Sequence, residues 1–131
     1  LAILNFGARL NETLKAAENL LKKGVPITVV DARFAKPLDE NLIWQLATTH
    51  EAIMTIEEGS SGGFGSHVVN FLTKKGLMDS NLKFRSMTLP DIFIDQDTPD
   101  NMYKIANLDS SSIEEKVLDV LNSNIVLQKQ K

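Results

Sequence analysis

Residues 52–75 read AIMTIEEGSSGGFGSHVVNFLTKK and contain the pattern that decides the fold. The apolar run 52–56 predicts a strand, which ends at Glu57 and Glu58 and is followed by a glycine-rich loop. From residue 66 to 75 the apolar side chains recur at helical spacing, and Gly76 ends the helix. A strand that leads through a short loop into a helix is the repeating unit of a parallel sheet.

The same alternation is visible on both sides of this stretch. Residues 1–7 and 27–31 are apolar and predict buried parallel strands, and a fourth strand is expected within 82–89. The intervening segment 8–23 predicts a helix with one buried face, formed by Leu10, Leu14, Ala17 and Leu21.

Three further helices are indicated by their termini. Asp39 precedes an amphipathic segment and is placed to cap it, and a short helix is expected at 102–106. Ser111 and Glu114 have the spacing of a capping box at the start of the last helix. We therefore predict an α/β fold, with a mainly parallel sheet and helices on both faces.

Length and composition limit the possible classes of protein. The 131 residues suit one domain, which we place at 1–121, with a frayed tail at 122–131. The absence of cysteine excludes disulfides and thiolate sites, and the apolar runs are too short to cross a membrane. A net charge of −3 without a basic run argues against nucleic-acid binding. The chain has neither an initiator Met nor a signal peptide, so we expect a soluble fragment of a longer protein.

The glycine loop allows two interpretations. Such loops bind phosphate at helix N-termini, but this one lacks the Lys-Ser/Thr pair of a P-loop, and Glu57 and Glu58 would repel an anion. The alternative, which we favour, is that the glycines let another backbone approach closely. On that hypothesis Gly63→Val would weaken the assembly of the full enzyme more than it weakens the stability of the isolated domain.

The remaining polar candidates are weaker. Arg33 and Lys36 could hold an anion, although an ion pair with Glu57 or Glu58 is the favoured alternative. His67 follows the glycine loop and is either a hydrogen-bonding interface residue or solvated, and His50 is expected to end a helix. The aspartates of 91–100 lack the spacing of a calcium loop, and no catalytic triad is present.

Several of these segments together resemble one family. They are DARFAKPLD at 31–39, EEG at 57–59, GGFGSHV at 62–68, LPD at 89–91 and Ile94-Asp95. Over residues 1 to about 121 the chain resembles the C-terminal domain of 1-deoxy-D-xylulose-5-phosphate synthase, a transketolase-type transferase. Pyruvate dehydrogenase beta subunits and other transketolases share a looser version of the pattern.

The resemblance implies a function for the full-length enzyme. That family uses thiamine diphosphate and magnesium to join a two-carbon unit from pyruvate to glyceraldehyde 3-phosphate, which releases CO2 and supplies isoprenoid and thiamine biosynthesis. Its cofactor-binding and catalytic residues belong to two preceding domains, so no catalytic, cofactor-binding or metal-binding residue is assigned to this chain. The isolated chain is expected to be inactive.

What the resemblance transfers is a role in assembly. The resemblance implies a three-layer α/β domain with helices on both faces of a mostly parallel sheet of about five strands, typically with one antiparallel edge strand. The domain is expected to pack on the preceding domains of the same enzyme and to contribute to a homodimer. The residues expected at that contact are Arg33, Lys36, Glu57, Glu58, Gly62, Gly63, Gly65 and His67. The location would be the cytoplasm, or a plastid in a plant or alga.

Two segments depart from the family pattern. The family commonly has His-Gly after Ile-Asp, where this chain has Gln96-Asp97, so no role is transferred to that loop. Ala106-Asn107-Leu108 replaces the usual Ala-Gly-Leu, and asparagine tolerates the left-handed conformation expected there. Two alternative functions remain open. The chain could be a separate α/β domain that binds an anion or nucleotide, or the C-terminal domain of another transketolase or pyruvate dehydrogenase beta subunit.

Overall fold

The computed structural model describes residues 1–129 and contains one parallel sheet. Its four strands are β1 (Ala2–Phe6), β2 (Thr28–Asp31), β3 (Ala52–Glu57) and β4 (Lys83–Met87), in the order β2-β1-β3-β4. All three pairings are parallel. The predicted α/β class is confirmed, but the prediction of about five strands is wrong by one, and no antiparallel edge strand occurs in residues 1–129.

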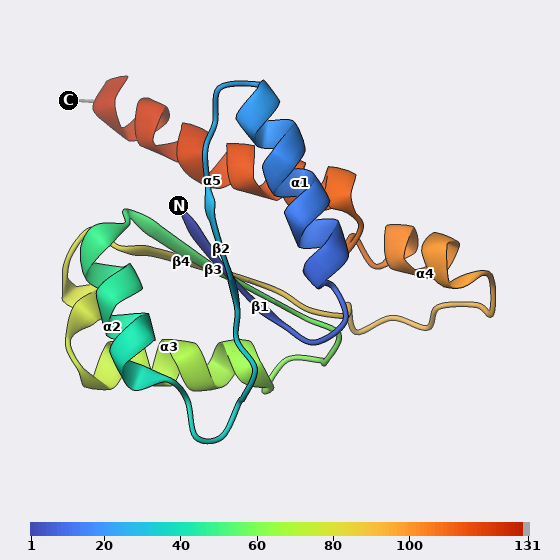
Figure 1. Cartoon of the computed structure of the whole chain (residues 1–131), viewed down its shortest axis with the longest axis horizontal. Coiled ribbons are helices and arrows are strands. Elements are labelled where there is room, and N and C mark those ends of the chain that lie inside the picture. Colours follow the sequence, from blue (N-terminus) through green and yellow to red (C-terminus); the bar gives the residue numbers. More distant parts are fainter. Residues whose placement is uncertain (130–131) are drawn as a thin grey trace.

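Helices cover both faces of the sheet, as predicted (Figure 1). α1 (Leu10–Lys22) and α5 (Ser110–Lys129) lie on one face, and α2 (Glu40–Thr49) and α3 (Phe64–Lys74) lie on the other. A short 3-10 helix, η1 (Leu77–Asp79), follows α3. Successive side chains of a strand point to opposite faces, so Met54 packs in the core beneath α1 and α5 while Ile53 packs beneath α2 and α3.

The burial of β2 and α1 differs from the sequence-based prediction. β2 is an edge strand, so Thr28 and Asp31 are exposed although the strand was expected to be buried. On α1 the buried residues are Thr13, Ala16 and Leu20. Two leucines of the predicted buried face are exposed instead, Leu14 by 49% and Leu21 by 61%.

The helix termini confirm one prediction and correct another. Asp39 caps α2, because its Oδ1 accepts a hydrogen bond from the Leu42 N–H at 3.0 Å. The capping box of Ser111 and Glu114 is wrong. α5 begins at Ser110, whose N–H donates to Glu12 Oε2 of α1 at 2.9 Å, and Glu114 bonds to α1 instead.

The backbone of α5 continues to Lys129, through most of the segment 122–131 for which a frayed tail was expected. Residues 130 and 131 lie outside the described residues, and the division of the chain at residue 121 stays a prediction.

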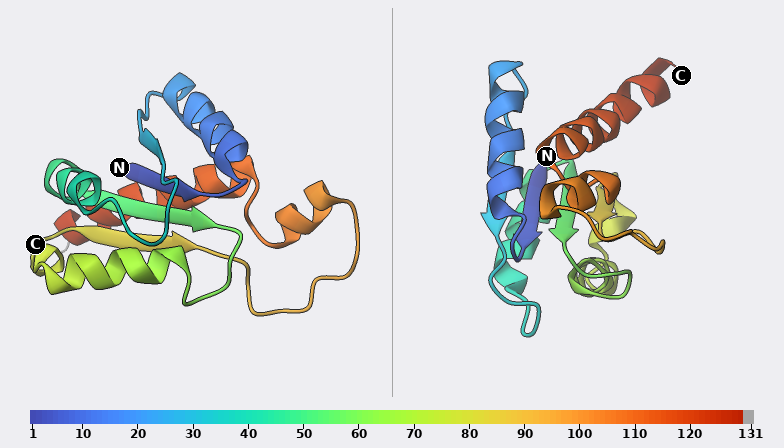
Figure 2. Two further views of the ribbon diagram at one scale, coloured as in Figure 1. Left: turned by 60° about the horizontal axis from the view of Figure 1, so that its bottom comes forward. Right: turned by 90° about the vertical axis from the view of Figure 1, so that its right-hand side faces the viewer.

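An arm projects from the compact body between β4 and α5 (Figure 2). We define the arm as residues 88–105; it consists of an extended segment and α4 (Pro99–Ile105). Thr98 caps α4 through the Asn101 N–H, and Asn107 returns the chain toward α5 with a left-handed φ of 57°, as expected for an asparagine in place of glycine. None of the described helices is long and apolar enough to span a membrane.

Candidate functional site

The strand order places one edge of the sheet in a position typical of ligand sites. From β1 the chain crosses to β2 on one side, and from β3 it crosses to β4 on the other, while β1 and β3 are neighbours. The loops that leave their carboxyl ends therefore diverge, which creates a crevice at this point of α/β sheets. The residues in these loops include Arg9, Glu57 and Glu58.

Glu57 ends β3, and its carboxylate is 3% exposed. Oε1 accepts a hydrogen bond from the Phe64 N–H at 3.0 Å, and Oε2 accepts one from the Gly65 N–H at 2.7 Å. These are first-turn groups of α3, where the helix dipole favours a negative charge. Glu57 is thus an internal anion bound at a helix N-terminus.

The glycines make room for this carboxylate. A Cβ at Gly63 would lie 2.1 Å from Glu57 Oε1, and a Cβ at Gly59 would lie 2.7 Å from the same atom. A Cβ at Gly65 would lie 2.7 Å from Thr55 Oγ1. The close approach that the sequence indicated is present within the chain itself, where the group nearest to Gly63 is the Glu57 side chain. The approach of another backbone to this loop stays a prediction.

These contacts bear on both cofactors of the resembled enzyme. The α3 N–H groups that could bind a diphosphate already bind Glu57, and a phosphate there would meet a buried negative charge. The described part of the chain has no group of three or more His, Asp or Glu side chains that could hold a metal ion. The residues on this edge do not fit thiamine diphosphate or its magnesium ion.

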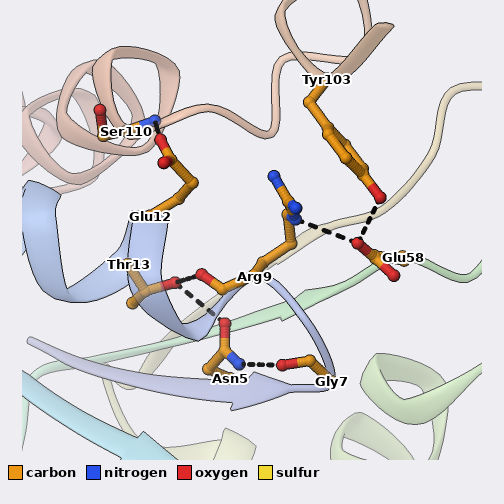
Figure 3. Close-up of polar contacts among 8 residues, drawn as sticks. All are labelled: Asn5, Gly7, Arg9, Glu12, Thr13, Glu58, Tyr103 and Ser110. Carbon is orange, nitrogen blue, oxygen red and sulfur yellow. Dashed lines mark hydrogen bonds and ion pairs between the residues drawn. The ribbon is translucent and has the colours of Figure 1, made fainter. Parts of the chain in front are cut away.

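Glu58 has different partners from Glu57 (Figure 3). Its Oε1 accepts hydrogen bonds from Arg9 Nε at 3.1 Å and from the Tyr103 hydroxyl at 2.6 Å. The Arg9 guanidinium also lies over the Tyr103 ring, 3.4 Å from its centroid. The hydrogen bond to Glu58 is the main cause that raises the pKa of Tyr103 above 10.0, with desolvation and the Glu58 charge adding to it and Arg9 opposing it.

A buried polar group fixes the turn that positions Arg9 (Figure 3). Asn5 on β1 is fully buried and donates from Nδ2 to the Gly7 carbonyl at 3.0 Å. The Thr13 hydroxyl lies 2.9 Å from Asn5 Oδ1 and 3.0 Å from the Arg9 carbonyl. Because Thr13 must face Asn5, this contact also explains why α1 buries Thr13, Ala16 and Leu20 and leaves Leu14 exposed.

The other predicted contact residues lie apart from Glu58. Arg33 and Lys36 are exposed in the loop between β2 and α2, and among residues 1–129 they pair with neither glutamate. The favoured ion pair is therefore wrong: Glu58 binds Arg9, and Glu57 binds α3. Lys36 and the half-buried His67 line one open groove of about 340 Å³ with Asn70 and Lys74.

The three glycines of the predicted contact are needed for different reasons. Gly63 and Gly65 pack against Glu57 and Thr55, whereas Gly62 has a left-handed φ of 99° and its N–H donates to Ser66 Oγ at 3.1 Å. The structure thus brings Glu57, Gly63 and Gly65 together, with Glu58 beside them. Arg33 and Lys36 lie on the loop between β2 and α2, and His67 lies on α3.

An apolar cavity of about 560 Å³ lies between the arm and the end of β3. Its lining combines the Glu58 carboxylate and Tyr103 with aliphatic side chains and prolines, namely Leu89, Pro90, Ile92, Ile94, Pro99 and Met102. Sequence reasoning missed this cavity and the role of Tyr103, because nothing in the local sequence shows that Tyr103 of α4 contacts Glu58, the residue that follows β3. The contact of Arg9 with Glu58 was missed for a similar reason, because it depends on the pairing of β1 with β3, which no local sequence signal shows.

Comparison with known proteins agrees with this architecture. The family model described as "Transketolase, C-terminal domain" matches residues 1–113. Among solved structures, a split-gene transketolase, determined as an inactive β4 tetramer, superposes with a TM-score of 0.81 at 26% sequence identity. The match covers 92% of this chain and 39% of that chain.

The chain belongs to the transketolase C-terminal domain family. The fold predicted from the resemblance is confirmed at this level: a transketolase C-terminal-like α/β domain. Because the chain spans 39% of the solved relative, the activity of a complete enzyme is a separate question.

Proposed function

We propose that this chain is the C-terminal domain of a thiamine-diphosphate-dependent 1-deoxy-D-xylulose-5-phosphate synthase. The full enzyme would convert pyruvate and glyceraldehyde 3-phosphate to 1-deoxy-D-xylulose 5-phosphate and CO2. Support comes from the membership in the transketolase C-terminal family and from the segments DARFAKPLD, EEG and GGFGSHV. Magnesium, a homodimer and a cytoplasmic or plastid location belong to the same proposal.

Within that enzyme the domain would be an assembly module without catalytic residues. The observation on which this rests is the Glu57 carboxylate, bound at 3.0 and 2.7 Å by the α3 N–H groups that would otherwise be free to bind a phosphate. The same observation counts against a separate anion-binding or nucleotide-binding domain. The proposed contact with the preceding domains consists of the accessible members of the predicted set, namely Arg33, Lys36, Glu58, Gly62 and His67, because Glu57 and Gly65 are buried inside the domain.

A second candidate is the C-terminal domain of another transketolase, and the specific observation in its favour is the solved relative, which is itself described as a transketolase. The two enzymes differ in the fate of the donor. The synthase decarboxylates pyruvate, whereas a transketolase transfers a two-carbon unit between sugar phosphates without release of CO2.

The test uses the full-length enzyme with thiamine diphosphate and magnesium. Purified enzyme receives pyruvate with glyceraldehyde 3-phosphate in one reaction and a ketose phosphate with an aldose phosphate in another, and the products are identified by mass spectrometry. We expect CO2 and 1-deoxy-D-xylulose 5-phosphate from the first reaction only. Product from the second reaction alone would favour the transketolase. Turnover by residues 1–131 without the preceding domains would refute the assembly role.

A further inference from the structure

Three large apolar side chains of the arm are exposed to solvent. Phe93, in the extended segment, is 89% exposed, Ile92 is 60% exposed, and Ile105 at the end of α4 is 50% exposed. An exposed phenylalanine next to an apolar cavity is typical of a surface that another polypeptide covers. Figure 2 shows that the arm stands away from the two helical layers, so no element of the described chain covers its outer side.

The charges around this surface indicate what covers it. Residues 88–105 contain four aspartates and one lysine, a net charge of −3. Asp91 and Asp95 flank Phe93 by two residues on either side, and neither forms an ion pair within residues 1–129. Asp97 is used locally, since it accepts hydrogen bonds from the Thr98 N–H and Asn101 Nδ2. Two arms cannot pair symmetrically, because their carboxylates would repel one another.

The cavity adds an acceptor for a cation. Both hydrogen bonds to Glu58 use Oε1, and Oε2 has no partner within residues 1–129. The cavity is large enough for one or two side chains, and its lining is apolar except for Glu58 and Tyr103. A lysine or arginine beside an aliphatic or aromatic side chain would satisfy both the lining and the free carboxylate oxygen.

We propose that the arm and the cavity beneath it receive a segment of the same enzyme that lies outside this chain, and that this segment presents a basic residue next to an apolar side chain. The inference rests on the proposed function, in which this chain is one domain of a longer enzyme. The solved relative supports such an occupant, because 39% of its length is matched and the rest of that chain lies outside the shared domain. This contact is additional to the one assigned to Arg33, Lys36 and His67.

The experiment is photo-crosslinking in the full-length enzyme. A benzophenone analogue of phenylalanine replaces Phe93, and in a control enzyme it replaces Trp44, an aromatic residue 46% exposed on α2 at the other end of the molecule. After irradiation the linked peptides are identified by mass spectrometry. We expect position 93 to link to a peptide that precedes residue 1 of this chain and contains Lys or Arg close to the linked side chain, and position 44 not to link to that peptide.

A charge variant strengthens the test. Asp95→Lys reverses the charge two residues from position 93, so it should reduce the yield of that linked peptide several-fold, and raising the salt concentration should reduce it in the parent enzyme. A link only to residues 1–131 of another copy, or no link at position 93, would overturn the proposal. Neither result depends on which product the enzyme makes, so the product assay and the crosslink can fail separately.

Discussion

The packing of Gly63 against Glu57 leads to a quantitative prediction for Gly63→Ala. The new methyl carbon would lie 2.1 Å from Glu57 Oε1 and 3.1 Å from Glu57 Cδ, and both distances are shorter than ordinary contacts. Gly63 is the N-cap of α3, and a shift of that helix would disturb the packing of its buried side chains Phe64, Val68, Phe71 and Leu72. The carboxylate must therefore shift, and both of its hydrogen bonds to the α3 N–H groups are weakened or lost.

The magnitude follows from these two bonds. A hydrogen bond to a charged group contributes about 1.5–3 kcal/mol, and partial resolvation of the displaced carboxylate offsets part of the loss. We expect Gly63→Ala to lower the free energy of unfolding of residues 1–131 by about 3 kcal/mol, a large share of the roughly 5–15 kcal/mol typical of a domain. For a chain of this length the midpoint of thermal unfolding would fall by about 10 °C.

A double-mutant cycle separates this cause from a general effect at the helix start. Urea unfolding is followed by circular dichroism for the parent chain, Gly63→Ala, Glu57→Ala and the double variant. In the Glu57→Ala background the clash is absent, so Gly63→Ala should cost about 1 kcal/mol or less, the cost of alanine at an N-cap. Equal costs in both backgrounds would refute the assignment of the glycine to its own domain and restore the neighbouring backbone as the reason for it.

Three further predictions concern single groups. Hydrogen bonds from Lys23 and Asn19 hold the pKa of Glu114 below 4.5. The parent chain should therefore be about 1 kcal/mol more stable than Glu114→Gln above pH 5, and this difference should shrink as the pH falls through the folded pKa. A difference in the free energy of unfolding that grows in acid would contradict this. Tyr103 is the only tyrosine, so a titration followed by phenolate absorbance reports its pKa alone, and that pKa should lie above 10.0 and fall in Glu58→Gln. Because the folded pKa is raised, the stability that Tyr103 gains from Glu58 is complete below pH 10 and is lost as the pH rises through the folded pKa. An unchanged pKa in Glu58→Gln would exclude the hydrogen bond. Thr55→Val should be neutral or stabilise the chain by up to about 1 kcal/mol, because the Thr55 hydroxyl is fully buried and has no partner within residues 1–129; a loss above 2 kcal/mol in urea unfolding would indicate a partner.

The elements of this fold were predictable because each has a local signal. The apolar run 52–56 gave β3, Asp39 gave the start of α2, and Asn107 adopts the left-handed conformation expected of it. All four strands had such a signal, whereas the fifth strand was implied by the resemblance alone and is not present in residues 1–129. The buried face of α1 was also missed: apolar spacing favoured Leu14, but the pairing of Thr13 with Asn5 rotates the helix by one position.

In the candidate site, too, the local arrangement was predictable and the partners of each side chain were not. The sequence placed Glu57 and Glu58 beside the glycine loop, and that proximity is present, but it could not tell which donors each carboxylate would bind. Charge matching favoured Arg33 and Lys36, which lie on the loop after β2, at the edge of the sheet. Arg9 lies on the loop after β1, the direct neighbour of β3, and so reaches Glu58 first. The order of strands, and not the inventory of charges, decides the pairing.

The two adjacent glutamates show how one edge of the sheet can serve both stability and assembly. Glu57 is buried, and both of its carboxylate oxygens accept hydrogen bonds from α3 N–H groups of the same chain. Glu58 is half-buried and lines the cavity; its Oε1 accepts a hydrogen bond from Tyr103 of the arm, and its Oε2 has no partner within residues 1–129. A partner segment that binds Glu58 would therefore also fix the position of α4, since both share Tyr103. Tyr103→Phe should therefore loosen the arm and lower the crosslink yield at position 93, with little change in the free energy of unfolding of the domain. Glu57→Gln should lower the free energy of unfolding and leave the crosslink yield at position 93 nearly unchanged.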